Sequence, residues 1–188
     1  MARTFNNIFV RGLTGAVGDQ FIIRQTRSGR TIIANKPSFD PNREFTEPQK
    51  AQQEAFRQAT SYAKFAKNEP VYINKAKGTT STAYNLAVAD WFGAPEVLEI
   101  DASNWTGESG QPIRIQATDN ILVTRVLVVI KDANDTVLEQ GEAVPSQTDG
   151  RWWIYTTKTL VNMTSAPQVA ATAFDLPGHD SVMVWSNN

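Results

Sequence analysis

The single histidine, His179, is the first candidate for chemistry, because imidazole titrates near neutral pH and often acts as a base or metal ligand. It lies in residues 176–180 (LPGHD), between Asp175 and Asp180. A Pro-Gly pair is typical of a turn, and a solvated loop histidine fits this segment better than a catalytic one. No serine stands in a nucleophile-elbow pattern, so a Ser-His-Asp triad would depend on His179 alone.

Two further segments have the composition of ligand loops. Residues 132–135 (DAND) resemble part of a calcium loop but lack the glycine and the distal glutamate of an EF-hand. Residues 12–18 (GLTGAVG) are glycine-rich, but no Gly-Lys-Ser/Thr ending follows, and the spacing does not fit a dinucleotide fingerprint. The chain has no cysteine, which excludes disulfides and thiolate metal sites. We therefore expect turns here, no cofactor, no metal and no enzymatic activity.

Charge is unevenly divided along the chain. Residues 1–94 carry 13 Lys/Arg against 7 Asp/Glu, and residues 95–188 carry 5 against 12, which gives +6 and −7. The simpler interpretation is solvated surfaces; the alternative is that the positive half of one copy meets the negative half of the next. The basic N-terminus with interleaved phenylalanines also fits nucleic-acid binding. The pI of 5.9 and the lack of a known motif argue against nucleic acid as a partner.

Three tryptophans in the second half are candidates for contact with a glycan or a protein partner. Neighbouring side chains in a strand face opposite ways, so Trp152 and Trp153 cannot both be core residues. Exposed large aromatic side chains tend to mark interfaces. The predicted contact residues are Trp105, Trp152 and Trp153.

The first forty residues predict a small β-sheet. Apolar runs at 5–10, 20–25 and 30–34 are separated by turn-rich segments, and residues 27–29 (RSG) suit a tight hairpin. Pro37 and Pro41 end the pairing. A sheet this small is marginal alone, so it needs helices or another copy of the chain to pack on.

Helical signals follow from residue 46 onward. Thr46, Pro48 and Gln49 have the types and spacing of a capped helix start, followed by apolar residues at three- and four-residue steps. A short helix is expected over 71–77 and a third over 83–92, before a Gly-Ala-Pro boundary at 93–95. The expected buried residues are Ala55, Phe56, Ala59, Tyr62, Ala63 and Ala66 in the first helix and Leu86, Ala89 and Phe92 in the third.

From residue 95 the pattern changes to short strands separated by turns every 8–12 residues. Seven strands in about 94 residues are typical of an immunoglobulin-like or fibronectin-like sandwich. The predicted fold is an α+β N-terminal unit (1–94; a β-hairpin with about three helices) followed by an all-β sandwich (95–188). The predicted strands cover 97–100, 112–117, 121–131, 137–140, 152–157, 168–174 and 182–185.

Residues 3–17, 31–37, 56–64 and 84–92, together with the Ig-like tail, resemble a group of uncharacterised bacterial, phage-like proteins. These have an N-terminal β-hairpin/helix unit and a C-terminal Ig-like domain. The resemblance covers nearly the whole chain. It implies a structural or assembly role and supplies no activity or catalytic residue.

These observations predict a non-enzymatic structural protein that self-assembles into a filament, tube or particle component; the alternative is an Ig-like binding module for a glycan or protein. The main partner is then a second copy, and a small-molecule ligand is unknown. No run of about 20 apolar residues and no signal peptide is present, so we expect cytoplasmic synthesis, with release inside an assembled particle left open. The predicted assembly residues are Phe5, Ile8, Phe9, Phe21, Ile23, Arg24 and Ile32.

Overall fold

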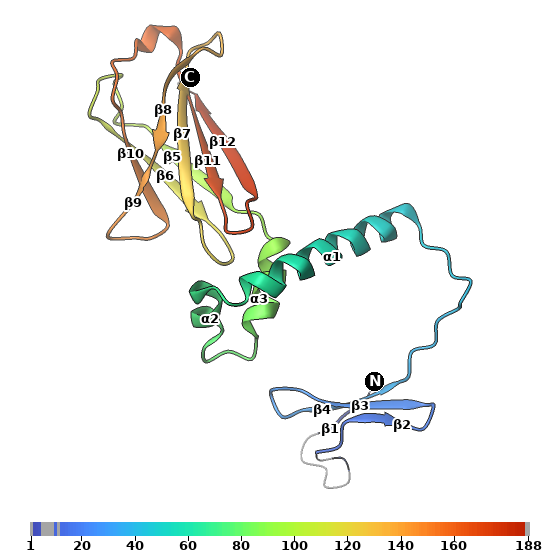
Figure 1. Cartoon of the computed structure of the whole chain (residues 1–188). Coiled ribbons are helices and arrows are strands. Elements are labelled where there is room, and N and C mark those ends of the chain that lie inside the picture. The colour runs from blue at the N-terminus through green and yellow to red at the C-terminus, as the bar shows by residue number, and fades with distance from the viewer. Residues whose placement is uncertain (1, 5–9, 11, 187–188) are drawn as a thin grey trace.

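The protein is described here by a computed structural model that covers residues 2–4, 10 and 12–186. Along the chain it forms a four-stranded antiparallel sheet, three helices, and two further four-stranded antiparallel sheets (Figure 1). The architecture is a mixed α+β fold with β-sandwich character, which confirms the predicted fold at this coarser level. No helix within the described ranges is long and apolar enough to cross a membrane.

The N-terminal sheet has the strand order β1-β4-β3-β2. Phe21–Gln25 is therefore a central strand, paired on both sides, and it offers no free backbone edge to a neighbouring copy. The edges are the two shorter strands instead. Of the predicted strand 5–10, residues 5–9 lie outside the described residues. The four strands are β1 (Ala2–Thr4), β2 (Gly15–Val17), β3 (Phe21–Gln25) and β4 (Thr31–Asn35).

The predicted hairpin joins β3 to β4. The Thr26 N–H donates to the Arg30 carbonyl at 2.8 Å, and the Gly29 N–H donates to the Thr26 carbonyl at 3.0 Å. Gly29 has φ +77°, a left-handed conformation that costs little without a Cβ atom. The turn therefore needs glycine at this position.

Three helices follow a linker over residues 36–46, and their starts match the capping signals of the sequence. The Thr46 N–H donates to the Gln49 side chain at 3.2 Å at the first helix, and the Thr82 hydroxyl accepts from the Asn85 N–H at 3.0 Å at the third. Pro70 opens the second helix, where the first N–H groups lack a helical acceptor anyway. The helices are α1 (Glu47–Ala66), α2 (Pro70–Ala76) and α3 (Ala83–Trp91).

The helical core is built from small residues around one large side chain. Ala59, Ala63 and Ala66 of α1 are buried at helical spacing, which brings α1 close to α3. Tyr72 of α2 is fully buried between them. The prediction for these three alanines is confirmed. It is wrong for Phe56, Ala89 and Phe92, which are exposed, and it did not include Ala87 and the charged Asp90 of α3, which are buried.

The second half forms two sheets with strand orders β5-β6-β10-β9 and β12-β11-β7-β8. Their inward side chains alternate with outward ones and pack into one apolar core. The predicted strand 121–131 starts only at residue 125, because Asp119 accepts two backbone N–H bonds in the turn before it. The strands are β5 (Glu96–Asp101), β6 (Pro112–Thr118), β7 (Arg125–Lys131), β8 (Val137–Glu142), β9 (Val144–Pro145), β10 (Trp152–Thr156), β11 (Gln168–Phe174) and β12 (Asp180–Ser186).

One carboxylate, Glu139 of β8, points into the sandwich. Its oxygens accept from the Tyr155 hydroxyl at 2.6 Å, the Lys158 N–H at 2.6 Å, and the N–H and hydroxyl of Thr159 at 3.0 and 2.7 Å. Gly141 leaves room for the Tyr155 ring, which a Cβ atom there would meet at 2.9 Å. Burial alone would raise the pKa of Glu139, but these hydrogen bonds outweigh it and the pKa is lowered.

Glu139→Gln is expected to lower the free energy of unfolding at pH 7 by about 2 kcal/mol, because an amide nitrogen would replace one acceptor oxygen among donors. Because folding lowers the pKa of Glu139, the ionised side chain stabilises the folded protein above pH 4.5, its pKa in the unfolded chain. This stabilisation is lost as the pH falls below that value. The difference from wild type should therefore shrink at pH 3.5. Urea unfolding at both pH values measures it, with Glu142→Gln, exposed on the same strand, as control. An equal loss for both variants would contradict the role of the Glu139 contacts.

Candidate functional site

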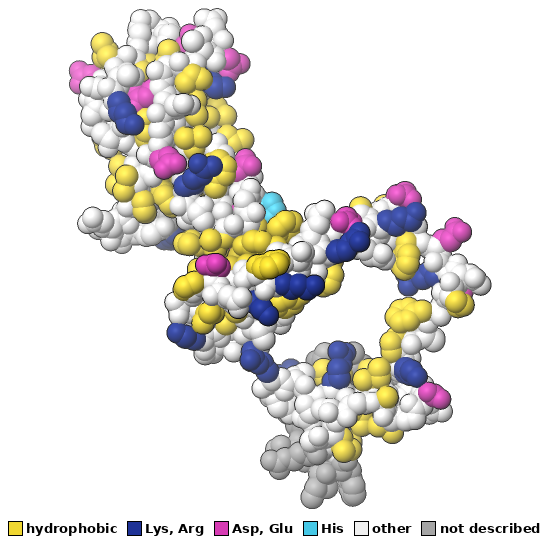
Figure 2. All heavy atoms as spheres, in the orientation of Figure 1, with side chains coloured by type: hydrophobic (Ala, Val, Ile, Leu, Met, Phe, Trp, Pro, Cys, Tyr) yellow, Lys and Arg dark blue, Asp and Glu magenta, His cyan; other side chains and the backbone are white. Residues whose placement is uncertain are grey.

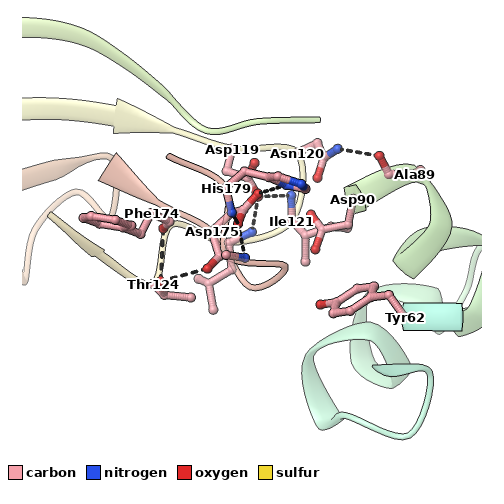
Figure 3. A network of polar contacts seen from close by, with 12 residues as sticks. Tyr62, Ala89, Asp90, Asp119, Asn120, Ile121, Thr124, Phe174, Asp175 and His179 are labelled. Atoms are coloured by element: carbon pink, nitrogen blue, oxygen red, sulfur yellow. Dashed lines mark hydrogen bonds and ion pairs between the residues drawn. The ribbon is translucent and has the colours of Figure 1, made fainter. Parts of the chain in front are cut away.

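The helices meet the sandwich at the turn that precedes β7. Lys75 Nζ of α2 donates to the carbonyls of Asn120 and Ile121 at 2.7 and 3.0 Å. Asn120 Nδ2 donates to the Ala89 carbonyl in the last turn of α3 at 3.2 Å. Ile121 and Leu176 from the sandwich loops pack against the helical core. We call this region the junction, and Figure 3 shows its polar contacts.

His179 and Asp175 lie together in the β11–β12 turn at the junction. Asp175 Oδ1 accepts from the N–H groups of Gly178 and His179 at 2.7 and 2.6 Å, and His179 Nδ1 lies 3.1 Å from Asp175 Oδ2. The imidazole ring also meets the Trp91 ring edge-on, with centroids 5.2 Å apart. The described hydrogen bonds join no serine or threonine hydroxyl to this ring. The pair therefore fixes the turn and packs it on α3.

A chain of hydroxyl groups leads from the surface of α1 to a buried carboxyl group. The Tyr62 and Tyr72 hydroxyl oxygens lie 2.7 Å apart, and the Tyr72 hydroxyl donates to Asp90 Oδ2. Asp90 is fully buried, and its Oδ1 has no hydrogen-bond partner among the described residues. Its neighbours also include Asp119 and Asp175.

Burial raises the pKa of Asp90 from 3.8 to about 6. The Tyr72 hydrogen bond and the charge of Lys75 act in the opposite direction, and the charges of Asp119 and Asp175 raise the pKa further. Ionisation of the Asp90 carboxyl group near neutral pH therefore lowers the stability of the folded protein. Within the described ranges no three acidic or histidine side chains are grouped as a metal site.

Ionisation of Asp90 should make the stability of the protein depend on pH. Because folding raises the pKa of Asp90, its contribution to the stability of the folded protein is fully present below about pH 3.8. This contribution is lost as the pH rises through about 6. Relative to Asp90→Asn, which keeps an acceptor for Tyr72, wild type should lose about 2 kcal/mol of unfolding free energy between pH 4 and pH 7.5.

Chemical unfolding of wild type and Asp90→Asn at the two pH values measures this loss. Asp135→Asn, a substitution of an exposed aspartate, serves as the control and should follow wild type. A constant difference between wild type and Asp90→Asn across this range would show that Asp90 does not titrate there.

Two of the three tryptophans predicted to contact a ligand are core residues, so that prediction is wrong for them. Trp105 is 3% exposed and Trp153 6%, because both side chains face the other sheet of the sandwich. Trp152 is half-buried on the outer side, where the Arg114 guanidinium lies 4.5 Å from its ring centre. Alternation in β10 predicted that one of the pair faces outward, but not which one.

The predicted assembly residues fall on both faces of the N-terminal sheet. Phe5, Ile8 and Phe9 lie outside the described residues. Phe21 and Ile23 share one face; Phe21 is exposed, whereas Ile23 is 6% exposed, which excludes its side chain as a contact for another molecule. Arg24 and Ile32 are cross-strand partners and share the opposite face.

That opposite face, which we call the Ile22 face, combines apolar residues with Arg24, and the register also places Arg3 of β1 opposite Ile32. Ile22 pairs with Ala34 of β4 and Ala16 of β2, beside the pair of Arg24 and Ile32. Its isoleucines and Ala34 stay partly exposed, and a hollow of about 380 Å³ opens there. Ile22 was not among the residues predicted from the sequence, because strand alternation separates the two faces without showing which one is covered. The Ile22 face consists of Ala16, Ile22, Arg24, Ile32 and Ala34.

The linker and the start of α1 expose further apolar side chains. Phe39 in the linker is 74% exposed, Phe45 and Phe56 are also exposed, and the first three turns of α1 have no buried residue. One hydrogen bond, from Arg27 Nη1 to the Ser81 carbonyl at 3.3 Å, joins described residues of the sheet to the helical part. Figure 2 shows hydrophobic side chains at the surface along this segment and around the junction.

A second apolar surface lies on the outer side of the β12-β11-β7-β8 sheet, and the sequence analysis did not identify it. Val182 and Val184 of β12 are 61% and 57% exposed. The register aligns Val184 with Ala170 and Val129, and Val182 with Thr172 and Leu127. Val182, Met183 and Val184 are consecutive apolar residues, and such a run indicates a strand that is apolar on both faces. We call this surface the valine face: Leu127, Val129, Ala170, Thr172, Val182 and Val184.

No protein-family model and no curated protein matches the sequence. Among solved structures, CopC from Methylosinus trichosporium OB3b is similar at 11% identity and a TM-score of 0.36, over 49% of this chain and 89% of that one. An engineered protein is similar at 16% identity and a TM-score of 0.33, over 55% of this chain and 26% of that one. Likenesses of this size indicate no function.

Proposed function

We propose that the protein is a non-enzymatic structural subunit that self-assembles through its N-terminal sheet. The observation that carries the proposal is a four-stranded sheet whose Ile22 face is not covered by any of the described residues, on a linker with exposed phenylalanines. Apolar surface left in water favours association, and an uncovered small sheet is marginal alone. Neither of the two hydrophobic cores of the described residues includes a residue of this sheet.

The opposite charges of the two halves support a head-to-tail arrangement. Contacts between different patches of identical chains propagate into a filament or close into a ring. The +6 and −7 halves would orient successive copies and speed their encounter. This arrangement supports a filament, tube or particle component more than a twofold dimer.

The proposal includes an immunoglobulin-like topology for residues 95–188. The order β5-β6-β10-β9 corresponds to strands A-B-E-D, and β12-β11-β7-β8 corresponds to G-F-C-C′. Such sandwiches serve many unrelated functions, so the topology alone does not distinguish an assembly subunit from a binding module.

The alternative is a binding module in which Trp152 contacts a glycan or protein partner. The observation in its favour is the half-exposed Trp152 ring with the Arg114 guanidinium stacked on it. With Trp105 and Trp153 in the core, no aromatic platform of three rings forms. The self-assembly proposal is supported by several exposed apolar side chains of the sheet, the linker and α1 rather than by one aromatic ring.

Removal of residues 1–36 is expected to abolish assembly and leave a folded monomer, because the helical and sandwich cores contain no residue of this segment. Light scattering on a sizing column and electron microscopy measure the outcome, with circular dichroism to verify folding. The matched control is Trp152→Ala in the full chain, which should still assemble. A truncated chain that polymerises like wild type would contradict the proposal, as would a wild-type chain of 20.8 kDa that remains monomeric at every concentration.

A further inference from the structure

We propose that the Ile22 face of one copy packs on the valine face of a second copy. The inference rests on the proposed function, because it names the surface of the neighbouring copy that receives the N-terminal sheet. It also explains why an outer strand at the edge of the sandwich is apolar on the side that faces water.

The two faces match in chemistry and in size. Both present aliphatic side chains from adjacent antiparallel strands, and stacked sheets of this kind bury such side chains between layers about 10 Å apart. Strands β3 and β4 have five residues each, roughly 17 Å, whereas β7, β11 and β12 have seven, roughly 24 Å. The smaller sheet can therefore lie fully on the larger one.

Each face carries a charge that has no described partner. Arg24 lies in the Ile22 face, exposed, with no ion pair or hydrogen bond in the described part of the chain. Asp180 is exposed at the margin of the valine face. It is the cross-strand partner of Phe174 and lies two residues before Val182, on the same side of β12. The Arg125 guanidinium on the same sheet stacks on Phe174 at 4.0 Å and pairs with Glu142 at 3.6 Å. An Arg24–Asp180 pair would fix the orientation of the packed sheets.

The occupant is a second copy because the helical part lies between the N-terminal sheet and its own sandwich (Figure 1). The helix has 20 residues, about 30 Å, and only its C-terminal part contacts the other helices at the junction (Figure 1). The linker leaves from the far end of α1, and the sheet contacts the helical part through Arg27 rather than the sandwich. A neighbouring copy can bring its valine face to this sheet, because its position is not fixed by the linker and the helices of the same chain.

A charge exchange tests the contact in the full-length protein. Arg24→Glu and Asp180→Arg should each raise the concentration of half-maximal assembly by about tenfold, because each variant places like charges together. The double variant Arg24→Glu/Asp180→Arg should return to within about threefold of wild type, since every contact again joins opposite charges. The controls Lys64→Glu and Glu108→Arg change exposed residues outside both faces and should have little effect. Sedimentation velocity measures all five variants.

The outcomes separate the inference from the proposed function. Assembly that requires residues 1–36 but does not recover in the double variant would overturn the valine face as the acceptor and leave the proposed function intact. A wild-type chain that never assembles would overturn both.

Engineered cysteines provide an independent test, because the chain has no cysteine of its own. Oxidation of mixed Ala16→Cys and Val184→Cys chains should give mixed dimers, whereas Ile154→Cys, exposed on the other sheet, should give none with Ala16→Cys. Dimers formed by Val184→Cys alone would show twofold pairing of sandwiches and overturn the inference. An internal disulfide in an Ala16→Cys/Val184→Cys chain, without dimers, would place the sheet on its own sandwich and also overturn it.

Discussion

Burial of the Asp90 carboxyl group at the meeting point of helices and sandwich is the constraint on which the arrangement of the chain depends. The Tyr72 hydroxyl donates to this group, while Lys75 of the same helix donates to the backbone of the sandwich turn. A buried acid is costly unless it is hydrogen-bonded or protonated, so its surroundings are closely specified. The helices are thereby fixed to one end of the sandwich, and the N-terminal sheet lies on the opposite side of the helices, where Arg27 contacts Ser81 (Figure 1).

This geometry separates the two apolar surfaces of the chain. The sandwich and the helices each have a core of their own, and both cores are complete without residues 2–35. The Ile22 face and the valine face are left partly exposed, on the N-terminal sheet and on the sandwich, with the helical part between them (Figure 1). Hydrophobic surface that a chain cannot cover within itself favours contact between copies. The proposed self-assembly therefore rests on the way the parts are joined rather than on any single motif.

The sandwich illustrates how polar groups are accommodated in such a core. Glu139 enters it only because four donors from Tyr155, Lys158 and Thr159 surround its oxygens. Gly141 makes this possible by leaving space for the Tyr155 ring. At the junction the Asp175 carboxylate is satisfied in the same way by the backbone of its own turn, which holds His179 against Trp91.

The sequence by itself determined the local elements: the Gly29 hairpin, the helix starts at Thr46 and Thr82, and most strands of the sandwich to within two residues. Turn chemistry, capping and alternation act over a few residues, so they are visible in the chain. Only the tertiary structure decided that Trp153 rather than Trp152 is buried, that β3 is central, and that Asp90 lies in the helical core. Periodicity separates the two faces of an element, but which face is covered depends on elements that are distant in sequence.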